Sequence, residues 1–245
     1  MAIGAFFDLD GTLLGSPSLE RRFLRYLRWR GELGVVHGAR WLLEFSRCVW
    51  THPFAAVQGN KAYLAGVRGS TLQAFLPLLS RRPFAFFPAA LVRLEWHAAQ
   101  GHRIFLVSGT LKPLAEAVCN QLPVKVIPCA TELEVVEGRW TGKVSLEAVC
   151  GPAKAHALAR LASAHRLDLG HSYAYGDSWG DRAMLECVGY PAAVNPSAWL
   201  ERLARQRGWP ILRWHERESP QQRGEAQREN RSAQRDGIPI LLRGK

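Results

Sequence analysis

The stretch Phe6-Phe7-Asp8-Leu9-Asp10-Gly11-Thr12-Leu13 decides the fold of this 245-residue chain. An apolar run that begins at Ile3 predicts a strand, which delivers two carboxylates to a glycine turn. Residues i and i+2 of a strand lie on the same side, so Asp8 and Asp10 can share one substrate. Because neighbouring carboxylates repel, the pair indicates a bound cation or a raised proton affinity. The alternative is an ordinary surface turn that closes a hairpin.

Beyond residue 88 the sequence alternates predicted helices and strands, which is typical of a parallel, doubly wound sheet. The predicted helices include 88–100, 152–165 and 196–206, the predicted strands are 103–108, 124–129, 172–175, 192–194 and 211–214, and a hairpin is predicted at 133–141. Such sheets bind ligands outside the carboxyl ends of their strands. Three strands end in polar groups suited to that place: Asp8 with Asp10, Ser108, and Asp177 with Asp181.

Residues 16–88 separate the first predicted strand from the rest of the sheet and show helical periodicity. Leu19, Phe23 and Leu27 recur at helical spacing, and arginines fill the other side of the same segment. The predicted helices cover 18–30, 36–50, 54–64 and 71–79, with a break at 81–83. We therefore expect an all-helical insertion of about seventy residues.

The chain divides by composition into three parts. Residues 1–15 and 89–215 are expected to form one α/β core domain, and residues 16–88 a helical domain inserted after the first strand. From about residue 216 to residue 245 the chain is rich in Arg, Glu, Gln and Ser, which is typical of a disordered tail.

The net charge of +11 is concentrated in the insertion. Residues 16–88 contain 11 basic and 3 acidic residues. Such a segment attracts anionic partners, although a solvated helical face has the same composition. We expect no nucleic-acid partner, because no nucleic-acid-binding module is recognisable.

Six aromatic residues of the insertion or its end are expected mainly in a core, namely Trp29, Trp41, Trp50, Phe84, Phe86 and Phe87. The alternative is that the basic and aromatic residues contact a membrane surface or an acyl-bearing substrate.

Other patterns exclude several classes of protein. The longest apolar stretch, near residues 84–92, is interrupted by Pro88 and is too short to span a bilayer. The five cysteines are scattered and lack CxxC spacing, so they predict free thiols. The N-terminus has neither a basic leader nor a small-residue cleavage site, and we expect a cytoplasmic protein.

The polar groups at the predicted strand ends suit phosphoryl transfer. Displacing the alcohol of a phosphate monoester requires a nucleophile, neutralised phosphoryl oxygens and a proton for the leaving group. One carboxylate can attack phosphorus, while a neighbouring carboxyl protonates the leaving group and later activates water. Mg²⁺ prefers oxygen ligands and retains several waters, so two or three aspartates are enough. Ser108 and Lys154 can interact with the phosphoryl oxygens.

Four motifs resemble, in order and approximate spacing, those of the haloacid dehalogenase superfamily of phosphohydrolases. They are Asp8-Leu9-Asp10-Gly11-Thr12, Ser108 after an apolar strand, Lys154, and Gly176-Asp177-Ser178-x-x-Asp181. The helical insertion is similar to the cap of the phosphoserine-phosphatase-like branch, subfamily IB, and the stretch from Ala130 to Lys154 resembles that branch too. The resemblance covers residues 3–214, but the cap matches by position and helicity only.

This resemblance implies a Rossmann-like core with a helical cap and a role for each motif. Asp8 resembles the nucleophile that becomes an aspartyl phosphate, and Asp10 resembles the general acid and base. The Mg²⁺ site would consist of the Asp8 carboxylate, the Asp10 carbonyl and the Asp177 side chain, while Asp181 would bind the metal or its waters. The implied phosphate-binding residues are Ser108, Gly109 and Lys154.

We therefore predict a Mg²⁺-dependent phosphatase that forms an aspartyl phosphate and acts on a small or lipid-like phosphate ester selected by the cap. Phosphoserine phosphatases usually show Gly-Asp-Gly-x-Asn-Asp in the last motif, whereas this chain has Ser178 and Gly180. Phosphoserine is therefore the alternative substrate rather than the first choice. A phosphotransferase, or a non-catalytic protein that binds an anion or a membrane, also stays open. The physiological substrate and the oligomeric state are not predicted.

Overall fold

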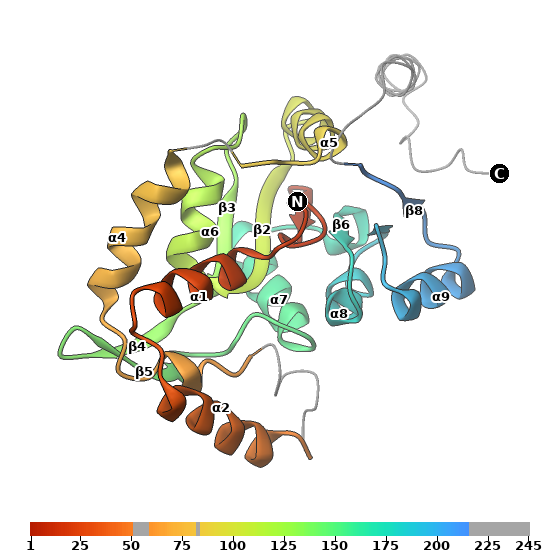
Figure 1. Ribbon diagram of the computed structural model, residues 1–245. Coiled ribbons are helices and arrows are strands. Elements are labelled where there is room, and N and C mark those ends of the chain that lie inside the picture. The colour runs from red at the N-terminus through yellow and green to blue at the C-terminus, as the bar shows by residue number, and fades with distance from the viewer. Residues whose placement is uncertain (51–58, 82–83, 216–245) are drawn as a thin grey trace.

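The computed structural model describes residues 1–50, 59–81 and 84–215 and shows a parallel sheet with helices on both faces (Figure 1). The strand order is β3-β2-β1-β6-β7-β8, and all neighbouring strands are parallel. The strands are β1 Gly4–Phe7, β2 Arg103–Leu111, β3 Ile127–Thr131, β6 Tyr173–Gly176, β7 Tyr190–Val194 and β8 Ile211–Leu212. This order confirms the predicted doubly wound α/β fold.

Strand β1 lies where the direction of the chain across the sheet reverses. Phe7 pairs with Leu106 of β2 on one side and with Tyr175 of β6 on the other. The chain runs from β1 outward to β2 and β3, and then returns to β6 on the opposite side of β1. Loops that leave adjacent strands diverge at such a switch point and leave a crevice at the carboxyl ends. Asp8 and Asp177 follow β1 and β6 directly and therefore flank this crevice.

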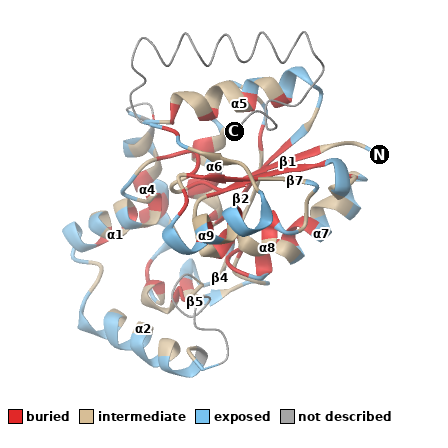
Figure 2. Cartoon of the chain, turned by 90° about the vertical axis from the view of Figure 1, so that its right-hand side faces the viewer, coloured by how far each residue is buried: buried red, intermediate tan, exposed pale blue. Residues whose placement is uncertain are grey.

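The alternation of side chains in β1 contributes to one apolar core on each face of the sheet. Phe7 stacks on Tyr175, with 4.4 Å between ring centroids, on the face covered by α5 (Pro88–Ala99) and α6 (Lys112–Cys119). Phe6 stacks on Phe105 at 5.2 Å on the opposite face. That face is covered by α7 (Ala153–His165), α8 (Arg182–Leu185) and α9 (Ala198–Arg207). Figure 2 shows the buried strands between these two layers of helices.

The insertion contains α1 (Leu19–Trp29), α2 (Val35–Cys48), the short 3₁₀ helix η1 (Ala62–Leu64) and α4 (Gly69–Ser80). The helix predicted at 54–64 is wrong at 59–61, which are not helical, whereas its residues 62–64 form η1. Residues 51–58 and 82–83, which include part of that helix and of the predicted break, lie outside the described residues. The same is true of the predicted tail at 216–245.

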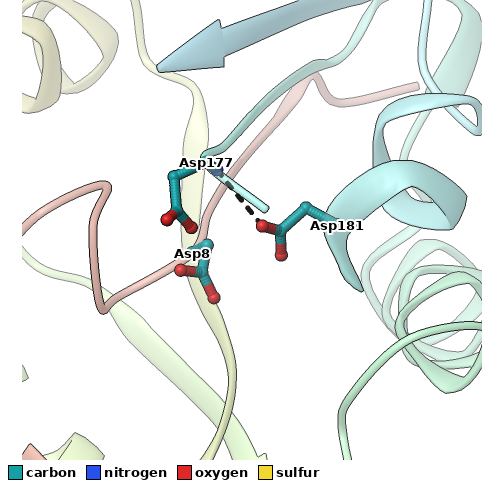
Figure 3. Close-up of side chains that lie close together, drawn as sticks. All are labelled: Asp8, Asp177 and Asp181. Atoms are coloured by element: carbon teal, nitrogen blue, oxygen red, sulfur yellow. Dashed lines mark hydrogen bonds between the residues drawn. The ribbon is translucent and has the colours of Figure 1, made fainter. Parts of the chain in front are cut away.

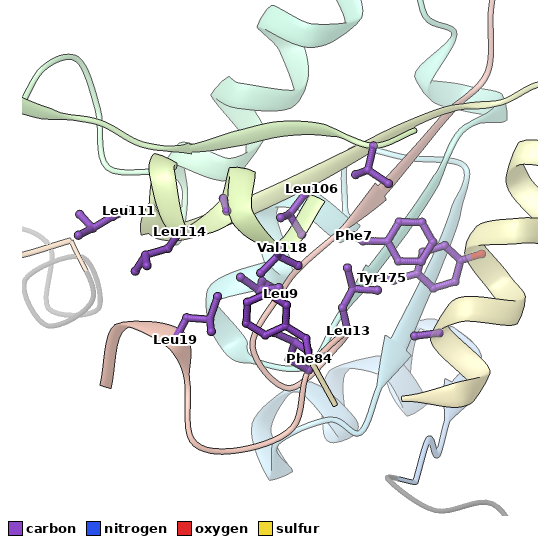
Figure 4. Packing of buried hydrophobic residues seen from close by; sticks show 14 of the residues in the cluster. Phe7, Leu9, Leu13, Leu19, Phe84, Leu106, Leu111, Leu114, Val118 and Tyr175 are labelled. Carbon is purple, nitrogen blue, oxygen red and sulfur yellow. The ribbon is translucent and has the colours of Figure 1, made fainter. Parts of the chain in front are cut away.

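Helices α1 and α4 pack into the core on the α6 side of the sheet. Leu19, Phe23 and Leu27 of α1 are fully buried. Figure 4 shows Leu19 in the same cluster as Leu114 of α6, and Leu9 and Leu13 of the loop after β1 also belong to this cluster. The base of the insertion therefore shares its apolar core with the sheet.

A hairpin from the second half of the chain pairs with the insertion. Its strands are β4 (Leu133–Val136) and β5 (Arg139–Val144), in agreement with the predicted hairpin. The backbone N–H of Gly66 donates to the carbonyl of Trp140 at 2.8 Å, and the Trp140 N–H donates to Val67 at 2.9 Å. The N–H of Gly69 donates to the carbonyl of Gly138 at 3.0 Å. These bonds attach the segment around η1 to the hairpin.

Helix α2 is the most exposed part of the insertion that the structure describes. Val35, Leu42 and Leu43 are more than half exposed, as is Val36. The expected core position is correct for Phe84 and Phe87, which are buried. It is wrong for Trp29 and Trp50, which are 81% and 90% exposed. None of the described helices combines the length and the apolar composition needed to cross a bilayer.

Candidate active site

The turn after β1 holds Asp8 beside β6. The Asp8 N–H donates to the carbonyl of Tyr175 at 2.9 Å, which continues the pairing of the two strands by one residue. Gly11 closes the turn with a φ of 93°, and a Cβ on this residue would lie 2.2 Å from Oδ2 of Asp177. Glycine is therefore required both by the backbone conformation and by the Asp177 carboxylate.

Three carboxylates meet in the crevice, as Figure 3 shows. Asp8, Asp177 and Asp181 can each offer an oxygen within 4.8 Å of the others. The Lys154 ammonium lies 2.5 Å from Oδ1 of Asp8 and 2.5 Å from Oδ1 of Asp181. When all these groups are ionised, one ammonium leaves two negative charges uncompensated. Oxygen ligands with that residual charge fit a divalent cation such as Mg²⁺.

The proton affinities of the cluster support the same interpretation. Burial and the neighbouring Asp181 carboxylate raise the pKa of Asp8 to about 7, although Lys154 opposes the shift. Burial and Asp8 raise the pKa of Asp177 to about 9. Burial alone would lower the pKa of Lys154, but Asp181 and Asp8 raise it above its ordinary value. The ionised carboxylates are thus costly without a cation, and a bound cation would lower this cost.

Asp181 is fixed by the turn that follows β6. Its Oδ2 accepts hydrogen bonds from the Ser178 N–H at 2.9 Å, the Ser178 hydroxyl at 2.8 Å and the Asp177 N–H at 3.2 Å. A Cβ on Gly176 would lie 2.4 Å from the Asp181 Cβ, so this glycine allows the close approach. Ser178, at which the sequence departs from the usual phosphoserine phosphatase motif, therefore orients Asp181.

The Asp10 side chain contacts the first residue of α1. Its Oδ1 accepts a hydrogen bond from the Leu19 N–H at 3.1 Å. Burial raises the pKa of Asp10 to about 6, and the bond from Leu19 opposes the shift. A carboxyl group that titrates near neutral pH is suited to proton transfer. The Asp10 side chain is outside the group of three carboxylates, and metal binding through its carbonyl stays a prediction.

The end of β2 supplies hydroxyl groups to the same place. The Ser108 side chain is buried, and its Oγ accepts a hydrogen bond from the Thr110 N–H at 3.2 Å. The buried hydroxyls of Thr110 and Thr12 have no hydrogen-bond partner among the described residues. Thr110 lines the crevice and was missed by the sequence reasoning, although its position in Ser108-Gly109-Thr110 is a usable signal.

All the predicted site residues line one cavity. It measures about 1520 Å³ and extends from the three carboxylates to helices α1 and α2. The structure therefore brings together Asp8, Asp10, Ser108, Gly109, Lys154, Asp177 and Asp181, which are spread over most of the sequence.

Glu20 and Tyr63, which line the cavity, belong to a second polar cluster that the sequence did not reveal. The Lys61 ammonium donates to both oxygens of Glu20, at 2.7 and 2.6 Å, and the Tyr63 hydroxyl also donates to Glu20. The Lys61 side chain is almost fully buried. These contacts connect α1 with the segment around η1. No local pattern marks them, because the partners are about forty residues apart.

Comparison with protein families gives a match over most of the chain. The model of the haloacid dehalogenase-like hydrolases matches residues 5–186. Phosphoserine phosphatase SerB1 of Mycobacterium tuberculosis is 30% identical over 224 residues, which cover 86% of this chain and 70% of that protein. The histidinol-phosphatase of Neisseria meningitidis is 30% identical over 226 residues, which cover 85% of this chain and 97% of that protein.

Solved structures show the same fold. A Bordetella pertussis protein described as having unknown function has a TM-score of 0.70 and 28% identity, over 86% of this chain and 99% of the other. A substrate-bound phosphoserine phosphatase has a TM-score of 0.61 and 16% identity, over 86% of this chain and 93% of the other. At 16% identity, the second likeness shows the fold alone.

Proposed function

This chain belongs to the haloacid dehalogenase-like hydrolase family, and on that premise we propose that it is a phosphatase that hydrolyses an organic phosphate monoester with Asp8 as the nucleophile. The observation that carries the proposal is the position of the Lys154 ammonium, 2.5 Å from both Asp8 and Asp181 within the cluster of three carboxylates. Relatives named as phosphatases support this class of reaction.

The first half of the reaction forms a bond between a carboxylate oxygen of Asp8 and phosphorus, and breaks the bond from phosphorus to the alcohol oxygen. Asp10 gives its proton to the departing alkoxide, for which its pKa of about 6 is suitable. In the second half, Asp10 takes a proton from water as the water attacks the phosphoryl group. The products are inorganic phosphate and the free Asp8 carboxylate.

The neighbours of Asp8 orient it and bind the phosphoryl group. Lys154 holds one oxygen of the Asp8 carboxylate and presents positive charge to the incoming dianion. Ser108 and Gly109 line the cavity at the end of β2, where a hydroxyl and a backbone N–H can donate to phosphoryl oxygens. The Thr110 hydroxyl, which has no hydrogen-bond partner among the described residues, can add a donor at the same strand end.

Asp8, Asp177 and Asp181 would hold Mg²⁺, together with the Asp10 carbonyl. When bound, the ion neutralises charge on the carboxylates and on the phosphoryl group. The fit rests on the two uncompensated negative charges and on the raised pKa values of Asp8 and Asp177.

The relatives do not assign the alcohol part of the substrate. Phosphoserine and histidinol phosphate, which their names indicate, differ in size and charge. Phosphoserine is the runner-up, and the departures at Ser178 and Gly180 count against it. A purely non-catalytic anion-binding or membrane-binding protein is disfavoured, since it would have no need of the complete set of motifs.

Replacement of the nucleophile tests the proposal. We expect Asp8→Asn to abolish hydrolysis of 4-nitrophenyl phosphate while circular dichroism shows a folded protein. EDTA should abolish the wild-type activity, and Mg²⁺ should restore it. Asp177→Asn should remain folded and lose the increase in melting temperature that Mg²⁺ gives to the wild type. Full activity of Asp8→Asn, or activity unaffected by EDTA, would refute the proposal.

A further inference from the structure

Helix α1 presents two opposite faces. Leu19, Phe23 and Leu27 face the core and are fully buried. At 100° per residue, Arg21, Arg25 and Arg28 lie on the opposite side of the helix, where all three are exposed.

The arginine face borders the cavity that contains Asp8. Arg21, Arg25 and Arg28 line this cavity, and Trp41 of α2 lies in its wall as well. Figure 1 shows α1 leading away from the end of the sheet toward α2. Counted from Leu19, which donates to Asp10, Arg21 lies about 3 Å along the helix axis, Arg25 about 9 Å and Arg28 about 14 Å. The arginines thus extend from the reaction centre along the cavity.

The charge of the arginine face is not balanced by ion pairs in the part of the chain that the structure describes. In the described ranges, none of the three guanidinium groups forms an ion pair with a carboxylate. Glu20 is the acidic residue on α1 in the cavity wall, but its carboxylate is occupied by Lys61 and Tyr63. Like charges spaced three and four residues apart destabilise a helix, and no carboxylate among the described residues pairs with these arginines to offset this cost. An anionic ligand would offset it.

We propose that Arg21, Arg25 and Arg28 form a second anion subsite, so that the substrate is a phosphate monoester whose alcohol part carries a further negative charge. This inference rests on the proposed phosphatase function and names the class of its substrate. The arginine face disfavours an alcohol with a net positive charge, such as histidinol. The distances along α1 favour an elongated alcohol that reaches Arg25, with a carboxylate or a second phosphate as the terminal group.

A series of matched esters tests the subsite. The probes are hexyl phosphate, its ω-carboxylate, its ω-phosphate and its ω-ammonium derivative, each compared by kcat/KM in the presence of Mg²⁺. The wild type should favour the two anionic esters over hexyl phosphate and disfavour the ammonium ester. In Arg25→Gln the ratio of anionic to neutral ester should fall about tenfold, the size expected for loss of a hydrogen bond between charged groups. Arg25→Lys should retain part of the preference.

Arg30→Gln is the matched control, since Arg30 follows α1, pairs with Glu32 and does not line the cavity. It removes the same charge and should leave the ratio at the wild-type value. Equal loss for all four esters in Arg25→Gln, or a wild type without charge preference, would overturn the subsite while Asp8-dependent hydrolysis stands. Absence of hydrolysis even with 4-nitrophenyl phosphate would instead refute the proposed function, and the subsite with it.

Discussion

Lys154 is the residue on which the charge balance of the site depends. It is the cation that contacts both Asp8 and Asp181, and its side chain is only 4% exposed. A buried carboxylate that loses its partner either takes up a proton or destabilises the fold. The lysine is therefore expected to stabilise the free protein as well as to assist the reaction.

Replacement of Lys154 by Gln should lower the free energy of unfolding by about 3–5 kcal/mol in EDTA at pH 8, because the buried carboxylates of Asp8 and Asp181 then lack their cation. Mg²⁺ should recover part of the loss. Urea unfolding with and without Mg²⁺ measures both effects. Lys112→Gln removes an exposed ion pair with Glu132 and should cost less than about 1 kcal/mol. A loss that is equal with and without Mg²⁺ would contradict this account.

The contribution of Asp10 to kcat/KM is expected to increase with the basicity of the leaving group. Asp10→Asn keeps an oxygen that can accept the Leu19 N–H, so the beginning of α1 should be preserved. It removes the proton donor, which contributes about 10²–10⁴-fold to rates of this kind. The fall in kcat/KM, which reports formation of the aspartyl phosphate, should be large for alkyl phosphates and much smaller for 2,4-dinitrophenyl phosphate. An equal fall for both esters would contradict the role as an acid.

The sequence predicts several of the site residues well because they lie near the ends of apolar strands. The carboxyl ends of parallel strands meet at one edge of the sheet. Asp8, Ser108 and Asp177 could be placed in this way. Glu20 with Lys61 could not, because their contact depends on how α1 packs against η1. The sequence leaves open whether the arginine face is solvated or binds an anion, since the helical pattern shows that a face is polar but not what lies opposite it.

At the scale of elements, α5 meets the sheet through a buried histidine. His97 Nε2 lies 2.9 Å from the Tyr175 hydroxyl, and His97 Nδ1 lies 2.8 Å from His102 Nδ1. Burial lowers the pKa of His97 to about 2, and the neighbouring His102 and Arg93 contribute to the shift. Burial also lowers the pKa of His102. The imidazole of His97 is therefore expected to be neutral in the folded protein at neutral and mildly acidic pH.

This histidine should make the protein acid-sensitive. The folded pKa lies below the unfolded value of 6.5, so the unfolded state binds the additional proton. His97 therefore does not reduce the free energy of unfolding above about pH 6.5. Below that pH, it lowers the free energy of unfolding by about 1.4 kcal/mol per pH unit. His97→Gln should have a smaller slope of unfolding free energy between pH 4 and 6.5, measured by urea titration. The exposed His156→Gln serves as the control, and identical slopes for His97→Gln and the wild type would contradict the assignment.

The sequence predicts some helices and strands correctly and others not. The hairpin at 133–144 and the helix that begins at Pro88 follow from turn residues and the fixed φ of proline. The attachment of the hairpin to residues 66–69 could not be predicted, because it joins backbone groups about seventy residues apart. The helix predicted at 54–64 is wrong at 59–61. There the side chains of Asn60 and Lys61 make polar contacts, and the backbone is not helical.

At the scale of the whole molecule, the shared core predicts that α1 unfolds together with the sheet. Phe23 of α1 packs against Phe75 of α4 and Trp140 of the hairpin, with ring centroids 5.2 and 6.0 Å apart. Phe23→Ala should cost about 3–5 kcal/mol. Unfolding followed by circular dichroism and by tryptophan fluorescence should remain one coincident transition. Trp29→Ala, on the exposed side of the same helix, should cost less than about 1 kcal/mol.

The backbone bonds between the hairpin and residues 66–69 also restrict how substrate can reach Asp8. A hinge motion of the entire insertion would break these bonds and expose the core shared by α1 and α4. Helix α2, of 14 residues, contacts the segment around η1, where Arg40 donates to the Ala65 carbonyl and the Trp41 carbonyl accepts from Asn60. The same helix lines the cavity that contains Asp8. We therefore expect substrate and product to pass beside α2, while the base of the insertion stays packed against the sheet.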